Sequence, residues 1–311
     1  MLTCSESDGI IRIETDVLQA AVRTRNYVTG IMGGSFVDKA TGARDPGWGL
    51  HIWDFLMAPG WRDDWYTKDR KIHGDLPKHL VESPQVSTQI PELEYSVVQG
   101  PKHVAVKVWF TFTKAGEGYR AGSCFEQTVL FTPDAPYVFS WETVRSVNDL
   151  PNMFYRFDMP GHVRHNRGDT FKQVYLSYFG LIKNEEFLED FPPDARFFYV
   201  RRDSAIPDRF IRACELPGTE PGRTRWLAGM TLDPAAPCEA WCHQRGYICF
   251  IQENHGRPVR CGQTVGAAYL IGYFDSVEDM QKAYDKFKGV RFVRVDENRY
   301  DLETEIPQTN P

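Results

Sequence analysis

The strongest constraint on the fold is the recurrence of apolar residues at every second position between His103 and Thr113. These residues are Val104, Val106, Val108, Phe110 and Phe112. A period of two places their side chains on one face of an extended chain, which is typical of a half-buried antiparallel strand. We therefore predict a strand here, with one face in a hydrophobic core.

Similar runs recur along the chain and are separated by turns rich in Gly, Pro and Asp. They cover residues 10–22, 124–132, 137–144, 171–178, 197–202, 209–215, 247–252, 267–273 and 291–295. About ten short strands of this kind indicate an all-β fold, an antiparallel β-sandwich. No internal repeat and no Pro/Gly-rich linker divides the chain, so we expect a single domain over residues 1–311.

Only one segment is predicted to be helical, and it lies near the C-terminus. Ser276 suits an N-cap with Asp279 three residues later, and Gly289 follows as a stop signal. The apolar stripe between them consists of Val277, Met280, Tyr284 and Phe287. By contrast, residues 45–91 show little periodicity, so this stretch is either a long functional loop or contains regular elements that periodicity does not reveal.

Charge and targeting signals narrow the possible partners. The chain has 36 basic and 42 acidic residues, a formal charge of −6, and no basic block that would follow a phosphate backbone. We expect no nucleic acid partner. No signal peptide and no run of eighteen apolar residues is present, so we also expect no membrane association. Seven cysteines, an odd number, suit reduced thiols and a cytoplasmic protein, or a secreted one if a signal was removed.

Aromatic residues make up 14% of the chain and often lie beside charged ones, as in residues 60–66, Gly-Trp-Arg-Asp-Asp-Trp-Tyr. Sugars have apolar faces and hydroxyl-rich rims, so aromatic platforms flanked by charged groups suit them. The alternative is a large β core with aromatic cross-strand pairs.

Three polar clusters are candidate sites. In residues 239–247, a strand would place four side chains on one face: Trp241, His243, Arg245 and Tyr247. Residues 160–169 contain His162, Arg164 and His165, and the expected long loop contains Trp61, His73 and His79. Each cluster has a structural alternative, either a solvent-exposed face with one hydrogen-bonded histidine or an ordinary polar loop.

Metal binding receives limited support. Cys238 and Cys242 have the spacing of half a zinc site, but Cys249 and Cys261 are too far apart to complete it. We therefore expect no cofactor, and leave open a catalytic divalent metal held by histidines and carboxylates.

The opening of the chain has a distinctive order of segments. A strand-like run over residues 12–22 is followed by Gly30 to Gly34 and then by residues 35–42, Ser-Phe-Val-Asp-Lys-Ala-Thr-Gly. In this last segment Asp38 and Thr41 suit bonds to the local backbone, and Gly42 supplies positive φ. The order resembles the first hairpin of galactose-mutarotase-like supersandwich proteins. That resemblance implies the supersandwich fold and carbohydrate chemistry, but a fold does not choose one activity.

The favoured function is a carbohydrate-active enzyme, first of all a lyase that cleaves a uronic-acid-containing oligo- or polysaccharide by β-elimination. This reaction needs a base for the proton α to the carboxylate and positive groups that stabilise the enediolate. We expect His243 or His162 as base, Tyr247 as acid, and Arg245 and Arg164 as carboxylate neutralisers. The substrate-binding residues would be Trp241, Arg164, His165, His79, His73 and Trp61.

Three alternatives stay open. An aldose 1-epimerase-like isomerase also needs an acid and a base, for which Glu239 or Glu253 with His243 would serve. A glycoside hydrolase leaves no local motif, because its two carboxylates come from distant strands. A non-catalytic sugar-binding domain would use the aromatic residues alone. The motifs of nucleotide hydrolysis, dinucleotide binding and serine hydrolases do not occur. We expect an anionic carbohydrate as the partner, and the sequence indicates no oligomeric state.

Overall fold

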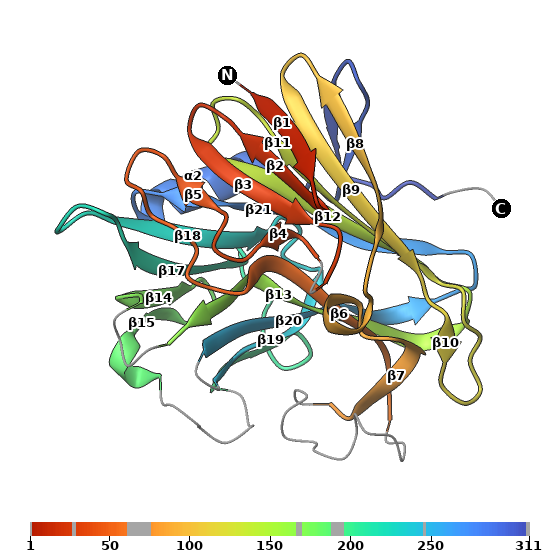
Figure 1. Ribbon diagram of the computed structural model, residues 1–311. Helices are drawn as coiled ribbons and strands as arrows, with labels where there is room; N and C mark the ends of the chain where they lie inside the picture. Colours follow the sequence, from red (N-terminus) through yellow and green to blue (C-terminus); the bar gives the residue numbers. More distant parts are fainter. Residues whose placement is uncertain are drawn as a thin grey trace.

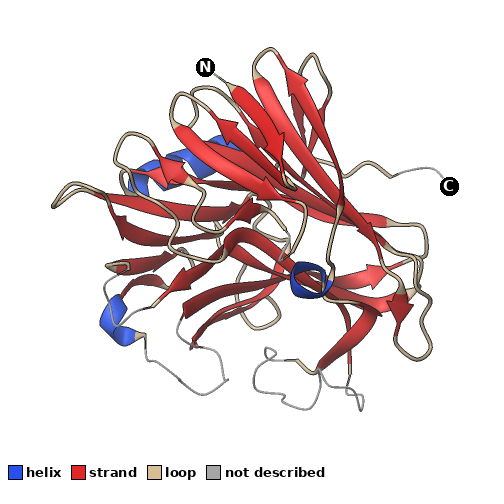
Figure 2. Ribbon diagram, viewed as in Figure 1, coloured by secondary structure: helices blue, strands red, loops and turns tan. Residues whose placement is uncertain are grey.

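The computed structural model describes residues 2–26, 29–60, 76–165, 170–187, 196–244 and 247–308. Two large antiparallel sheets lie face to face, and a separate two-stranded hairpin lies near the C-terminus (Figures 1 and 2). The all-β antiparallel sandwich predicted from the sequence is therefore confirmed. No helix in the described ranges is long and apolar enough to cross a membrane.

The larger sheet has twelve strands. Nine follow one another in the order β1 (Thr3–Ser7), β2 (Ile10–Glu14), β3 (Leu18–Arg23), β4 (Ile31–Met32), β6 (Gly49–Pro59), β13 (Leu150–Arg164), β20 (Tyr247–Val259), β19 (Pro237–Gln244) and β16 (Arg196–Val200). Beside this path, β5 (Val37–Asp38) pairs with β3, β7 (Lys78–Ser83) with β6, and β10 (Lys114–Ala115) with β7.

The smaller sheet has nine strands. Their order is β15 (Gly180–Lys183), β14 (Gln173–Leu176), β17 (Ile211–Pro217), β18 (Thr224–Thr231), β21 (Thr264–Phe274), β12 (Tyr137–Arg145), β11 (Cys124–Phe131), β9 (His103–Thr111) and β8 (Glu94–Gly100). The strand predicted from alternation is β9, and Val104, Val106 and Val108 are buried as expected. The hairpin consists of β22 (Phe292–Val295) and β23 (Tyr300–Glu303).

The predicted helix is α2 (Val277–Phe287), and the Ser276 hydroxyl caps it by accepting a hydrogen bond from the Asp279 amide at 3.1 Å. Met280, Tyr284 and Phe287 are buried against the outer face of the smaller sheet. Two shorter helical turns also occur, α1 (Val86–Gln89) and the 3-10 turn η2 (Asn184–Glu186).

Of the two interpretations of residues 45–91, the structure supports the second, because the described part of this segment contains β6, α1 and β7. All but two of the eleven residues of β6 are buried. An interior strand covered on both faces shows no alternation, so periodicity did not reveal it.

The opening segment also differs from the expected single strand over residues 10–22. The chain turns after β2, where the Thr15 hydroxyl accepts hydrogen bonds from the amides of Val17 and Leu18. The later turn has part of the predicted chemistry, since the Thr41 hydroxyl accepts a hydrogen bond from the Ala43 amide and Gly42 has a φ of +70°. The Asp38 carboxylate instead accepts hydrogen bonds from the side chains of Thr41 and Arg225.

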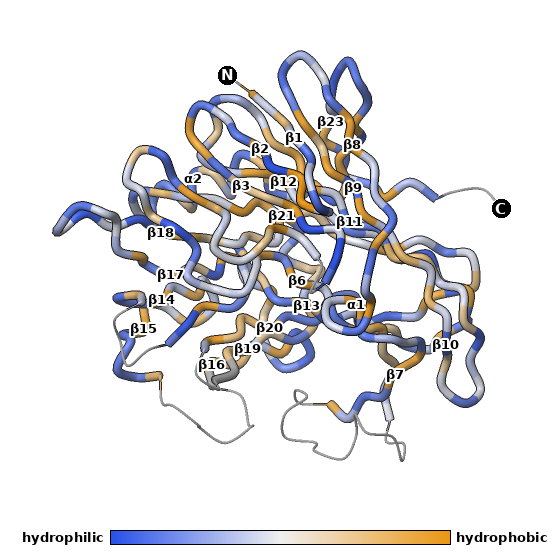
Figure 3. Tube along the Cα trace, viewed as in Figure 1, coloured by the Kyte–Doolittle hydropathy of each residue, from blue (hydrophilic) through white to orange (hydrophobic). Residues whose placement is uncertain are grey.

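The main core lies between the two sheets, and Figure 3 shows apolar stretches along the strands with hydrophilic residues gathered in the loops. A polar contact crosses this core. His51 Nε2 in β6 lies 2.7 Å from Glu142 Oε2 in β12, and both side chains are fully buried. Ser140 holds the other ring nitrogen at 2.7 Å, and the Tyr269 hydroxyl donates to the second oxygen of Glu142. Each group is thus paired inside an apolar layer.

We expect Glu142→Ala to lower the free energy of unfolding by about 3–5 kcal/mol, because it leaves His51 buried without its partner. Urea unfolding measures this loss. Glu126→Ala is the control: it breaks the exposed Lys107–Glu126 pair of the same sheet, which we expect to contribute about 0–1 kcal/mol. Equal losses for the two variants would contradict a structural role for the buried contact.

Candidate functional site

The candidate site lies where β13 is distorted in the middle of the larger sheet. The pairing of β13 with both β6 and β20 shifts register after Asp158 and resumes near Gly161 and His162. Gly161 is required here, because a Cβ would come within 2.0 Å of the Gly49 carbonyl oxygen. Such bulges re-aim side chains, and they are common beside active sites.

The two faces of β13 have different surroundings. Tyr155 and Phe157 belong to the main core between the sheets. Phe154 belongs to a small separate apolar cluster, so the alternating residues Arg156 and Asp158 point to the face turned away from the main core. The site is built on this outer face.

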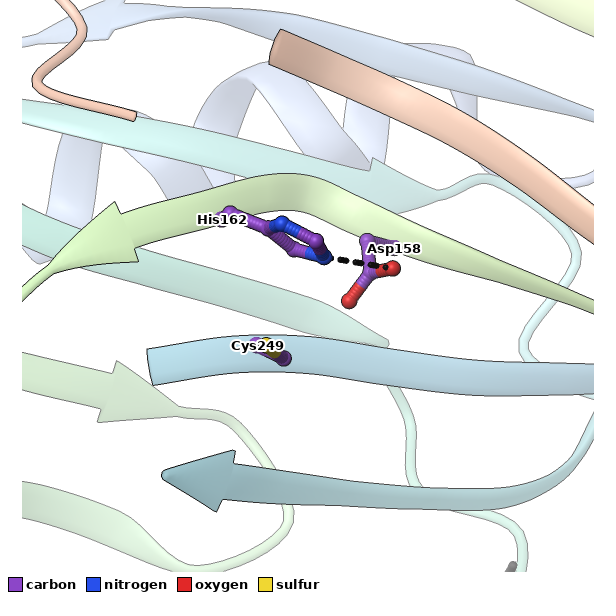
Figure 4. A group of neighbouring side chains, drawn as sticks. All are labelled: Asp158, His162 and Cys249. Carbon is purple, nitrogen blue, oxygen red and sulfur yellow. Dashed lines mark ion pairs between the residues drawn. The ribbon is translucent and has the colours of Figure 1, made fainter. Parts of the chain in front are cut away.

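Figure 4 shows His162 at the bend of β13 with its ring directed at Asp158, and Cys249 on the adjacent strand β20. His162 Nε2 lies 3.0 Å from Asp158 Oδ2, and the His162 side chain is 18% exposed. Burial of the imidazole opposes its protonation, but the Asp158 carboxylate and, after it, Cys249 outweigh this and raise the pKa of His162 well above its usual value. The second oxygen of Asp158 is buried and accepts no hydrogen bond from the described residues.

The same three residues are the described group best able to hold a metal ion. Ligand atoms of Asp158, His162 and Cys249 lie within 4.8 Å of one another, and no other such group occurs in the described ranges. The mixture of carboxylate, imidazole and thiol suits zinc best. In the structure, however, the nitrogen of His162 is directed at Asp158, and this ion pair occupies both groups.

A second carboxyl group lies nearby in β6. Asp54 is the extra residue between Trp53 and Phe55, which pair with consecutive residues of β13. Its Oδ1 accepts hydrogen bonds from Gln85 and Ser87 at the start of α1. Burial and the negative charge of Asp158 raise the pKa of Asp54 to about 6. Asp54 therefore interacts electrostatically with the Asp158–His162 pair, and its pKa lies near neutrality.

One aromatic ring contacts His162, and a second contacts the first. Tyr247 stacks on the imidazole, with ring centroids 6.1 Å apart and an interplanar angle of 13°. Trp48 meets Tyr247 edge-on at 5.4 Å, and 45% of its surface is exposed. An exposed indole next to polar groups is the surface a sugar ring packs against.

A buried charge network fills the neighbouring part of this face. Lys78 lies 2.9 Å from both Glu239 and Glu253, and Arg156 pairs with Glu253. Burial opposes the charge on Lys78, but the two glutamates raise its pKa, and Lys78 and Arg156 lower the pKa of Glu253. Two positive and two negative groups therefore neutralise one another away from solvent.

Of the residues expected from the sequence, the structure brings His162, Arg164 and Tyr247 together. Arg164 lies opposite Tyr247 in the β13–β20 pairing and is exposed. His165 and His79 are buried in other contacts: His165 with the Phe187 carbonyl oxygen, and His79 with the Gly60 carbonyl and the Tyr119 hydroxyl.

Trp241 does not share one strand face with Tyr247, as the sequence suggested. Strand β19 ends at Gln244 and β20 begins at Tyr247, antiparallel to it, because the chain reverses between them. Trp241 is fully buried, with Arg156 over its ring at 5.1 Å and Phe198 stacked at 5.5 Å. Trp61, His73 and Arg245 lie outside the described residues, as does the side chain of His243.

Asp54, Asp158 and Trp48 were not among the site residues expected from the sequence. Asp54 interrupts an apolar run in β6, and a lone acid in such a run is the signal that could have identified it. Asp158 lies four residues before His162, but that spacing becomes a contact only through the bulge.

Comparisons with known proteins give fold-level likenesses only. No protein-family model and no curated protein matches the chain. Galactose 1-epimerase from Lactobacillus acidophilus NCFM is 10% identical, with a TM-score of 0.43 over 89% of this chain and 98% of that one. A galactose mutarotase-like protein from Lactobacillus casei ATCC 334 is 12% identical, with a TM-score of 0.43 over 86% and 100%.

A third structure, 4-alpha-glucanotransferase from Thermococcus litoralis, is 10% identical, with a TM-score of 0.41 over 89% of this chain and 40% of that one. At TM-scores below 0.5 these three likenesses carry no argument about this chain.

The pairing of Asp158 with His162 is testable by histidine-selective NMR. We expect His162 to titrate above its usual range, and Asp158→Asn to lower its pKa, because the neighbouring negative charge is removed while burial remains. An unchanged midpoint in Asp158→Asn would show that the carboxylate does not control the imidazole.

Proposed function

We propose that this chain is an enzyme that transfers protons on a sugar at the Asp158–His162 pair, with epimerisation of an aldose at its anomeric carbon as the reaction. The observation that carries the proposal is the ion pair itself. It lies at a bulge, on the outer face of the larger sheet, beside a stacked tyrosine and an exposed tryptophan.

Anomeric epimerisation needs one group to give a proton and one to accept a proton. His162, charged through its contact with Asp158, would donate to the ring oxygen of the sugar while the bond from this oxygen to the anomeric carbon breaks. Asp54 would accept the proton of the anomeric hydroxyl, giving the open-chain aldehyde. Closure on the opposite face returns both protons, so the enzyme is unchanged after one turnover.

Asp158 acts here as a positioning residue. It directs His162 Nε2 and stabilises the positive imidazole, as carboxylates do for catalytic histidines elsewhere. Trp48 and Tyr247 offer apolar surface for the sugar ring.

The charge network supports epimerisation over β-elimination as the first candidate. Elimination from a uronate needs cations that neutralise the substrate carboxylate. The buried Arg156 is paired with Glu253, and Lys78 with Glu239 and Glu253. A lyase is the second candidate, because Arg164 is exposed beside Tyr247 on the same pair of strands.

The test follows anomer interconversion by NMR exchange spectroscopy with a panel of aldoses and acidic sugars. We expect the wild type to exceed the spontaneous rate, and His162→Asn to lose at least about a hundredfold of that acceleration. His255→Asn is the matched control, since His255 has a φ of +75°, a conformation that Asn tolerates well. Wild-type activity in His162→Asn would remove this residue from the mechanism.

The same protein is assayed with uronic-acid oligosaccharides by ultraviolet absorbance. Elimination forms a conjugated double bond, and epimerisation does not. A rising absorbance without anomer exchange would replace the first candidate by the lyase.

The rate should rise with pH through about 6, because Asp54 must be ionised to accept a proton and burial beside Asp158 raises its pKa to about 6. His162 stays protonated across this range, since its pKa is raised. The residual activity of Asp54→Asn should not show this rise of the rate with pH. The decisive window covers about one pH unit on each side of the Asp54 pKa, from about 5 to about 7. A wild-type rate that does not change with pH across this window would rule out Asp54 as the base.

A further inference from the structure

A pocket next to the Asp158–His162 pair carries positive charge without a matching acid. It has a volume of about 270 Å³, and its lining includes Arg23 from β3, Arg164 from β13 and Trp48. No acidic side chain of the described residues lines it. Among the described residues, neither guanidinium forms an ion pair. Arg23 donates hydrogen bonds to the Asn26 carbonyl oxygen at 3.5 Å and to the Met32 sulfur at 3.3 Å.

The pocket is joined to the proposed catalytic residues through backbone and aromatic contacts. Gly47 lines it and lies so close to His162 that a Cβ would come within 1.5 Å of the His162 carbonyl oxygen. Gly33, also in the lining, lies under the backbone of Trp48, where a Cβ would come within 2.5 Å. Trp48 in turn contacts Tyr247, which stacks on His162.

Strand geometry directs one of the arginines toward the same side as His162. Arg164 follows His162 by two residues in β13, and a period of two places both side chains on one face of the strand. Tyr247 lies opposite Arg164 on β20. A sugar whose ring contacts His162 is therefore long enough for one of its substituents to reach Arg164.

A second pocket is also lined by arginines, so arginines alone do not distinguish the pocket beside His162. A cavity of about 430 Å³ along β2 and β3 is lined by Arg12 and Arg44, but Glu14 lines it as well. Glu14 also accepts a hydrogen bond from Lys39. That cavity therefore has an acid in its wall, whereas no acid of the described residues lines the pocket beside His162.

We propose that the pocket lined by Arg23, Trp48 and Arg164 is an anion subsite, which selects a sugar carrying a carboxylate or phosphate group. Guanidinium groups bind both oxyanions through charge-assisted hydrogen bonds, which are about twice as strong as neutral ones. The inference rests on the proposed function, which places the sugar ring beside His162. It adds to that function the class of sugar that binds. The reaction that supplies this substrate would be one that releases an acidic monosaccharide or phosphorylates a sugar.

Binding is measured by isothermal titration calorimetry with three probes: glucose, glucuronate and glucose 6-phosphate. We expect one acidic probe to bind at least about tenfold more tightly than glucose, and Arg164→Gln and Arg23→Gln each to lose that advantage about tenfold. The acidic probe that binds more tightly identifies the group as carboxylate or phosphate. Arg12→Gln, which removes a guanidinium from the other pocket, should leave the affinities unchanged.

Urea unfolding of the three arginine variants shows whether a loss of affinity comes from a loss of folded protein. Because Arg164 is exposed, Arg164→Gln should unfold at the wild-type midpoint. Equal affinities for glucose and both acidic probes, or affinities within about twofold of wild type in both subsite variants, would overturn the proposal.

His162→Asn separates this inference from the proposed function. We expect it to bind the acidic probe like the wild type while losing anomer exchange. Arginine-dependent binding of an acidic sugar by a wild type that exchanges no anomers would support the subsite and reject the reaction. Exchange of neutral and acidic sugars at equal rates, with equal affinities, would support the reaction and reject the subsite.

Discussion

The buried contact between His51 and Glu142 holds the two sheets in the register that the site requires. His51 lies in β6, beside the site strand β13, and its backbone has a φ of +56°, which is uncommon for a residue with a side chain. A slip of β6 by one residue would turn His51 away from Glu142 and invert every neighbouring side chain. The contact therefore fixes the position of β6, and with it that of Asp54 three residues later.

The outer face of the larger sheet uses charge in two ways. Around Lys78, two cations and two carboxylates satisfy one another in the absence of solvent, and the result is a rigid support for β13, β19 and β20. Around His162 the polar and charged groups are not all paired with one another. One oxygen of Asp158 is buried without a partner in the described ranges, and two guanidiniums face a pocket without an acid. Unsatisfied polar groups of this kind concentrate at functional sites, where a ligand completes them.

The fold class and several elements could be predicted from the sequence because their signals are local. The alternation in β9 and the Ser276 cap of α2 need no knowledge of the rest of the chain. Strands β6 and β13 were missed for opposite reasons. β6 is apolar along most of its length, and β13 contains prolines, a glycine and charged residues that are typical of a loop. Those charges are tolerated in β13 because distant strands supply their partners.

The same distinction applies to the site. The residue types of His162, Arg164 and Tyr247 marked them as candidates, but their assembly depends on the pairing of β13 with β20. The spacing of these residues along the chain does not predict that pairing. Trp241 had an equally suggestive neighbourhood, yet it is covered by Arg156 and Phe198. Residue chemistry thus identified the members of the site, and only tertiary structure separated them from buried residues of the same types.

A crystal structure of the protein with a bound acidic monosaccharide tests the central claim most directly. The account predicts a sugar ring against Trp48, its acidic group at Arg23 or Arg164, and its ring oxygen about 2.6–3.2 Å from a nitrogen of His162. A sugar bound elsewhere, such as in the cavity along β2 and β3, would contradict it. So would a metal ion held by Asp158, His162 and Cys249, because the nitrogen of His162 that is proposed to donate the proton would then bind the metal.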